Sequence, residues 1–136
     1  MKKIVGAIFL FSIVACAQGR DIRIGFVSLT TAKEPTSGKG PDEFAPNVLV
    51  RFTKQGTNAK VLALTDKTGT AFVPLEAGSY CAEAYGVDGR PAKLSNISKQ
   101  PLHRCFTAVA GRAVEFSLTL AADSKYGGSI PSVVIE

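Results

Sequence analysis

The sequence predicts an all-β protein, a single Greek-key β-sandwich of about seven strands. Short segments in which apolar and polar residues alternate recur along the chain, with the period of a half-buried strand. Turn residues such as glycine, proline and aspartate separate these segments, and no segment has a convincing helical period. Short strands at this spacing are typical of a sandwich.

The chain opens with a secretory signal, which we place at residues 1–17. Lys2 and Lys3 precede an uncharged apolar run that is too short for a stable membrane span. The run ends in Ile13-Val14-Ala15-Cys16, which resembles a bacterial lipobox and makes Cys16 a candidate lipidation site. The small residues around Cys16 equally fit ordinary cleavage before Gln18. Both readings predict export to the periplasm, the outer membrane or the exterior.

Residues 18–47 are predicted to hold one strand and a long loop or arm. Ile22, Ile24 and Phe26 alternate with polar or small residues, as in a half-buried strand. Residues 30–47 break this pattern with several prolines and glycines, so we expect a mobile surface segment there.

The sandwich itself is predicted over residues 48–121, beginning with the alternation of Val48, Val50 and Phe52. Further strands are expected at 61–64, 71–73, 80–85, 105–109 and 114–120, with turns at 65–69, 74–78 and 88–89 and an irregular stretch at 91–102. In the 80–85 strand, the even-numbered residues face one way and the odd-numbered ones the other. Residues 122–136 are predicted as a glycine-rich hinge and a C-terminal strand, Ile130 to Ile135.

The central part of the chain resembles the carboxypeptidase regulatory-like domain, a prealbumin-like (transthyretin-like) sandwich. The resemblance covers roughly residues 46–121 and is carried by Thr65-Asp66-Lys67-Thr68-Gly69 followed by Leu75-Glu76-Ala77-Gly78-Ser79-Tyr80. Tyr80 is positioned to bury its ring while its hydroxyl reaches the backbone at a corner. The resemblance implies a mostly non-catalytic module that binds protein or carbohydrate, aids folding or acts as a spacer.

Two cysteines remain after the signal, Cys81 and Cys105. An even pair in an exported chain predicts a disulfide. The alternatives are a metal-binding pair, which would want nearby histidines or further cysteines, and two buried free thiols.

The charge pattern argues against a nucleic-acid partner. Removing Lys2 and Lys3 with the signal lowers the net charge from +5 to +3. The remaining basic residues are scattered along the chain, whereas a nucleic-acid footprint needs a cluster. We expect contact with a membrane only through a lipid on Cys16.

Residues for catalysis are sparse, and we expect no enzyme activity and no cofactor. His103 is the single histidine, so a catalytic triad has one possible base, next to the expected disulfide. A metal site would need Asp66, Asp88 and Asp123 to converge from separate loops, and we expect none.

We therefore expect a non-enzymatic binding or structural module of the bacterial envelope, with a protein or carbohydrate ligand. Its contacts are predicted in the irregular segments at the ends of the sandwich, with Tyr85 and Arg90 as candidate binding residues. Ile130 to Ile135 is a second candidate, as a strand that completes this sheet or a partner's. The alternative is a small inhibitor or immunity-type protein that blocks an enzyme through residues 33–47.

Overall fold

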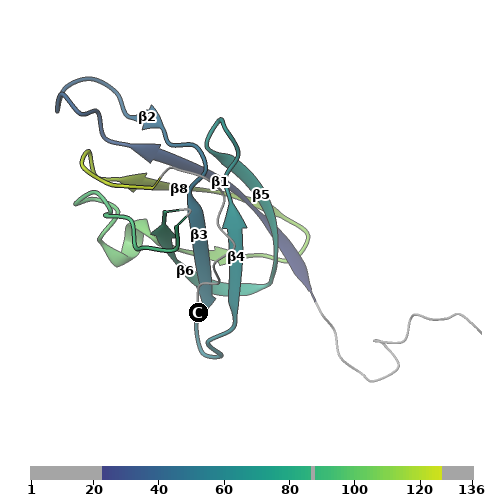
Figure 1. The fold of residues 1–136 in the computed structure, drawn as a ribbon. Coiled ribbons are helices and arrows are strands. Elements are labelled where there is room, and N and C mark those ends of the chain that lie inside the picture. The colour runs from purple at the N-terminus through teal and green to yellow at the C-terminus, as the bar shows by residue number, and fades with distance from the viewer. Residues whose placement is uncertain (1–22, 87, 127–136) are drawn as a thin grey trace, which may run out of the picture.

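The protein folds into two four-stranded β-sheets that pack face to face (Figure 1). This computed structural model describes residues 23–86 and 88–126, so the predicted signal, Cys16 and the predicted C-terminal strand lie outside the described residues. The predicted all-β sandwich is confirmed, with eight strands instead of about seven. The strands are β1 (Ile24–Lys33), β2 (Glu43–Phe44), β3 (Leu49–Lys54), β4 (Lys60–Leu64), β5 (Thr70–Glu76), β6 (Gly78–Tyr85), β7 (Cys105–Ala108) and β8 (Ala113–Leu120).

The first sheet is built around β1. On one side, β1 pairs antiparallel with β5 from Ile24 to Thr30, and then with the short β2 at Ala32 and Lys33. On the other side it pairs in parallel with β8 from Phe26 to Lys33. The N-terminal strand thus lies in the middle of a sheet and belongs to the same core as the strands after residue 48.

The second sheet has the order β4-β3-β6-β7, with every neighbouring pair antiparallel. Leu49 at the start of β3 lies between Leu64 of β4 and Tyr85 of β6. Arg51 lies between Leu62 and Glu83 in the same way. Figure 1 shows β3, β4 and β6 in front of the first sheet.

The core fills the space between the two sheets. The predicted inward residues are fully buried: Val48 just before β3, and Val50 and Phe52 within it. The predicted alternation of β6 is also confirmed, because its even-numbered residues from Tyr80 to Ala84 are buried and the odd-numbered ones are partly exposed. Phe52, Phe106 and Phe116 form an aromatic cluster with ring centroids 4.7 to 6.5 Å apart.

The predicted break in the pattern at Thr30 is wrong, because β1 continues to Lys33. Thr31 is fully buried, and its hydroxyl donates a hydrogen bond of 2.7 Å to the carbonyl of Ala45. Because its hydroxyl has a hydrogen-bond partner, Thr31 can occupy an inward position of the strand, although its polarity had suggested an exposed one. The predicted loop is also interrupted by β2, so part of it is tied to the sheet.

The predicted turn over residues 74–78 is likewise shorter than expected, because β5 runs through Pro74 to Glu76. Proline has no N–H to donate to a strand ladder. It is tolerated here because β5 pairs only with β1 among the described strands and so lies at an edge of its sheet.

Two local features of the predicted family motif are present. The hydroxyl of Tyr80 donates a hydrogen bond of 2.6 Å to the backbone carbonyl of Glu76, and the residue as a whole is 2 % exposed. In the β4–β5 turn, one carboxylate oxygen of Asp66 accepts hydrogen bonds from the backbone N–H groups of Thr68 and Thr70. The hydrogen bond from the Thr68 hydroxyl, together with these two backbone bonds, lowers the pKa of Asp66 from 3.8 to about 2.

Candidate functional site

The predicted disulfide is present between β6 and β7. Cys81 and Cys105 lie directly opposite each other in the antiparallel pair, with their Cα atoms 4.0 Å apart. The neighbouring N–H of Ala82 bonds to the carbonyl of Arg104, so the cysteines form a non-hydrogen-bonded pair, where opposite side chains approach closest. The bridge is consistent with an extracytoplasmic, oxidising location.

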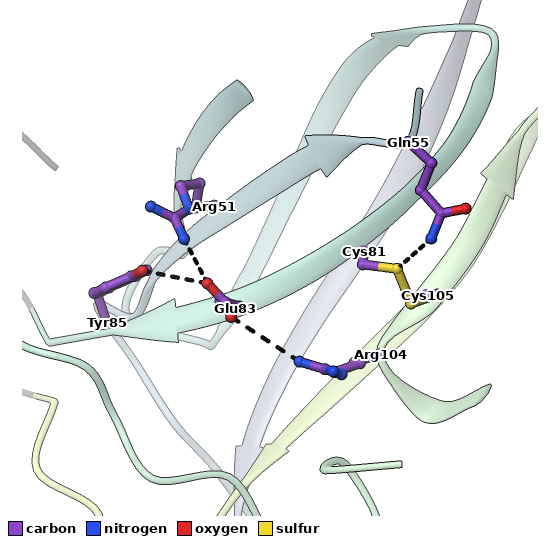
Figure 2. Close-up of polar contacts among 7 residues, drawn as sticks. All are labelled: Arg51, Gln55, Cys81, Glu83, Tyr85, Arg104 and Cys105. Carbon is purple, nitrogen blue, oxygen red and sulfur yellow. Dashed lines mark hydrogen bonds and ion pairs between the residues drawn. A yellow bond between two sulfur atoms is a disulfide. The ribbon is translucent and has the colours of Figure 1, made fainter. Parts of the chain in front are cut away.

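Beside the disulfide, four polar side chains meet on the outer surface of the second sheet (Figure 2). Glu83 of β6 is at the centre. One of its oxygens accepts hydrogen bonds from Arg51 of β3 at 2.5 Å and from the hydroxyl of Tyr85 at 3.3 Å. Its other oxygen lies 4.0 Å from a guanidinium nitrogen of Arg104. The strand register brings Arg51 and Glu83 opposite each other, which fixes the position of the group.

Tyr85 is held from two sides. The guanidinium of Arg51 lies 5.2 Å from the centre of the Tyr85 ring, within the range of a cation–π contact. Partial burial raises the pKa of Tyr85, while Arg51 opposes this shift. At neutral pH the phenol therefore stays protonated and keeps its hydrogen bond to Glu83.

Apolar side chains surround this polar group. Leu62 and Leu64 of β4 are 43 % and 37 % exposed, and Leu49 of β3 lies between Leu64 and Tyr85. We call this surface the β3–β6 face and define it by Leu49, Arg51, Leu62, Leu64, Glu83, Tyr85 and Arg104. It offers apolar area together with a tyrosine and two arginines, which are residue types that protein interfaces favour, and one carboxylate, which is a type that they disfavour.

The two predicted binding residues do not form one site. The side chain of Tyr85 belongs to the β3–β6 face, whereas that of Arg90 points to solvent, 86 % exposed, with a nitrogen 3.9 Å from Asp88. Their backbones are close, because Tyr85 pairs with Pro91 in an isolated bridge. Arg90 is thus on the rim near the end of β6.

Arg51, Glu83 and Arg104 were not predicted as site residues. The sequence places Arg51 and Glu83 at outward positions of two strands, but only the register shows that they oppose each other. Oppositely charged residues at outward positions of two predicted strands favour the register that places them side by side, and this signal could have identified the pair. The buried Nε atom of Arg104 has no hydrogen-bond partner among the described residues.

Residues considered for catalysis or metal binding lie apart. His103 is exposed in the 3₁₀ helix η2 (Pro101–His103). Asp66 is engaged within its own turn, and Asp123 accepts a hydrogen bond of 3.1 Å from Lys93. Within residues 23–86 and 88–126, no three histidine, cysteine, aspartate or glutamate residues are grouped to hold a metal ion.

In the same described ranges, no helix is long and apolar enough to cross a bilayer.

No family model matches the chain, and no curated protein matches it. Among solved structures, a leucine-rich repeat protein from Bacteroides thetaiotaomicron is similar with a TM-score of 0.42 and 23 % sequence identity. The match covers 72 % of this chain and 12 % of that protein. A likeness at this level carries no argument about function.

Proposed function

We propose that this chain is a non-enzymatic binding or accessory module of the bacterial envelope, which uses the β3–β6 face to hold a protein partner. In this proposal the chain is exported by its N-terminal signal and anchored by a lipid on Cys16. The Cys81–Cys105 bridge supports an oxidising compartment. The lipobox-like residues 13–16 support the anchor.

The observation that carries the proposal is the composition of the β3–β6 face. Exposed leucines of β4 lie beside an arginine–tyrosine–glutamate group that is already ordered by its own contacts. Side chains fixed before binding lose little conformational freedom when a partner docks. The arginines outnumber the single carboxylate, so the face suits a partner segment with an acidic side chain next to apolar ones. Tyr85 is the one aromatic residue of this face, which favours protein over carbohydrate.

We also propose membership of the carboxypeptidase regulatory-like domains for residues 46–121. Two features support this proposal. Tyr80 of the motif donates a hydrogen bond to the Glu76 carbonyl, and Asp66 of the motif accepts the backbone hydrogen bonds that hold the β4–β5 turn. The family's usual accessory role agrees with the binding function proposed above.

The test compares two charge insertions on opposite outer surfaces. Leu62→Glu places a carboxylate in the β3–β6 face, and Ser117→Glu places one on the exposed outer surface of the first sheet. Each variant is expressed in the native host, cross-linked in intact cells and purified, and cross-linked partners are identified by mass spectrometry. We expect a partner that the wild type and Ser117→Glu both retain and Leu62→Glu loses. The same partners for all three proteins would refute this use of the face.

The inhibitor function is the second candidate, and the β1–β2 loop favours it. Residues 36–42 are all exposed, and Figure 1 shows the loop extending beyond the sheets. β2 anchors the end of this loop to β1, as an inhibitory loop requires. Replacing residues 36–42 by a short glycine–serine linker leaves β2 and buried Ala45 in place. An inhibitor would lose its one-to-one complex with its target enzyme, and a β3–β6 face binder would keep its partner.

A further inference from the structure

The end of the sandwich where β1 begins is assembled from several turns. The carbonyl of Arg23 accepts a hydrogen bond from Ala77 in the β5–β6 turn, and the carbonyl of Ile24 accepts one from Gly111 in the β7–β8 turn. Gly25 permits the close approach of that second turn, because a Cβ atom there would lie 2.3 Å from the carbonyl oxygen of Val109. We call this region the N-terminal end.

Apolar side chains are exposed at and beside the N-terminal end. Ile24 is 41 % exposed, Val109 is 42 % exposed and Phe72 is 63 % exposed. Phe72 stacks on Phe26 with the ring centroids 5.1 Å apart, so the two rings present a joint apolar surface on the first sheet. A contiguous exposed apolar surface is a candidate contact surface, and the stacked Phe26 and Phe72 rings supply its contiguous part here.

The charges of the same end are mainly positive. Arg23, Lys54 and Arg112 lie there with Glu76, which pairs with Lys54 at 2.6 Å. The exposed Glu115 of β8 lies further along the same outer surface, at the level of Phe72. Arg112 is exposed in the β7–β8 turn. Basic side chains that flank exposed apolar ones fit the surface of a bilayer with anionic lipids, where headgroups attract the cations and the interface accepts the apolar groups.

The chain between Cys16 and this end is short. Seven residue steps separate Cys16 from Arg23, so even a fully extended chain spans no more than about 25 Å. The opposite end of β1 lies about 30 Å further away, because a strand rises about 3.3 Å per residue and β1 has 10 residues. A lipid on Cys16 therefore keeps the N-terminal end within about 25 Å of the bilayer, and it allows the far end of β1 to lie further away.

We propose that the N-terminal end rests on an anionic lipid surface, with Ile24, Phe72 and Val109 in contact with the interface and Arg23 and Arg112 beside the headgroups. This inference rests on the lipid anchor of the proposed function, and it goes beyond the sequence-based expectation that only the lipid on Cys16 contacts a membrane. It gives the anchored protein an orientation in which the β1–β2 loop and the far end of the sandwich point away from the membrane.

The chain itself supplies a clean test. It has no tryptophan, and with Cys81 and Cys105 bridged, Cys16 is the single free thiol of a protein that starts at Cys16. Cys16 is coupled to a maleimide lipid in vesicles of phosphatidylcholine with phosphatidylglycerol. Ile24→Trp reports on the N-terminal end, with Phe72→Trp as a second probe if the first variant fails to fold. Phe44→Trp, at a residue 70 % exposed beside Ala32 at the far end of β1, is the matched control.

We expect the Ile24→Trp emission to shift to the blue and to lose roughly half its intensity when brominated lipids are present, as an interfacial indole does. The emission of Phe44→Trp should keep both its wavelength and its intensity. Adding Arg112→Glu should reduce the quenching of Ile24→Trp, while Lys39→Glu in the β1–β2 loop should leave it unchanged. Equal quenching at both tryptophans, or none at either, would overturn the proposal.

This experiment is separate from the lipidation that it assumes. The lipid is attached chemically, so the vesicle result depends on the surface of the folded protein alone. The mass of the protein from its native host tests the natural anchor.

Discussion

Removing the hydroxyl of Tyr80 should destabilise the fold. Tyr80→Phe keeps the ring in the core, where it stacks with Phe106 at a centroid distance of 5.9 Å, and removes the donor of the bond to the Glu76 carbonyl. Loss of a part-buried hydrogen bond that leaves its acceptor short of a donor costs about 1–2 kcal/mol. Unfolding entropy grows with chain length, so for about 120 residues this corresponds to a fall in Tm of about 4–8 °C.

The matched control is Tyr85→Phe, the same chemical change five residues away. The Tyr85 hydroxyl meets Glu83 at 3.3 Å on the partly exposed β3–β6 face, so we expect a loss below about 0.5 kcal/mol. Urea unfolding at neutral pH, followed by far-ultraviolet circular dichroism, measures both free energies of unfolding. Equal destabilisation by the two variants would refute the structural role assigned to the Tyr80 bond.

Two further predictions concern the disulfide and the β4–β5 turn. The double variant Cys81→Ser/Cys105→Ser should lose about 3 kcal/mol of unfolding free energy, because the chain-entropy model assigns roughly that value to a bridge with a sequence separation of 24. Adding reductant should lower the Tm of the wild type and leave the Tm of this variant unchanged. A continued effect of reductant on the variant would contradict the bridge. The pKa of the Asp66 carboxylate is lowered to about 2 in the folded state. The ionised carboxylate therefore stabilises the fold at pH values above its unfolded pKa of about 4, and this contribution is lost as the pH falls from about 4 through about 2. Asp66→Asn should lower the Tm at pH 7 and flatten the dependence of Tm on pH in that window, and an unchanged acid dependence would contradict the assignment.

Local patterns were sufficient for the parts of the fold that alternation controls. The inward set of Val48, Val50 and Phe52 is confirmed because each strand buries one face and exposes the other. The Tyr80 bond followed from a motif in which the donor and the acceptor are four residues apart. The Cys81–Cys105 bridge followed from counting cysteines in an exported chain.

Long-range pairing was beyond these patterns. The parallel pairing of β1 with β8 joins residues almost 90 positions apart, and nothing in either segment encodes that register. The end of β1 was misplaced because Thr31 is polar yet fully buried, with its hydroxyl satisfied by Ala45. The β3–β6 face was only half predicted for the same reason, since Tyr85 meets Arg51 through strand pairing rather than through proximity in sequence.

The most direct test of the account is the intact mass of the protein purified from its native host, measured with and without reduction. We expect a chain that begins at a diacylated or triacylated Cys16 and gains two hydrogens on reduction, from the Cys81–Cys105 bridge. A chain that begins at Gln18 would keep export but contradict the anchor. A chain that retains Met1 and shows no change on reduction would contradict the exported module itself.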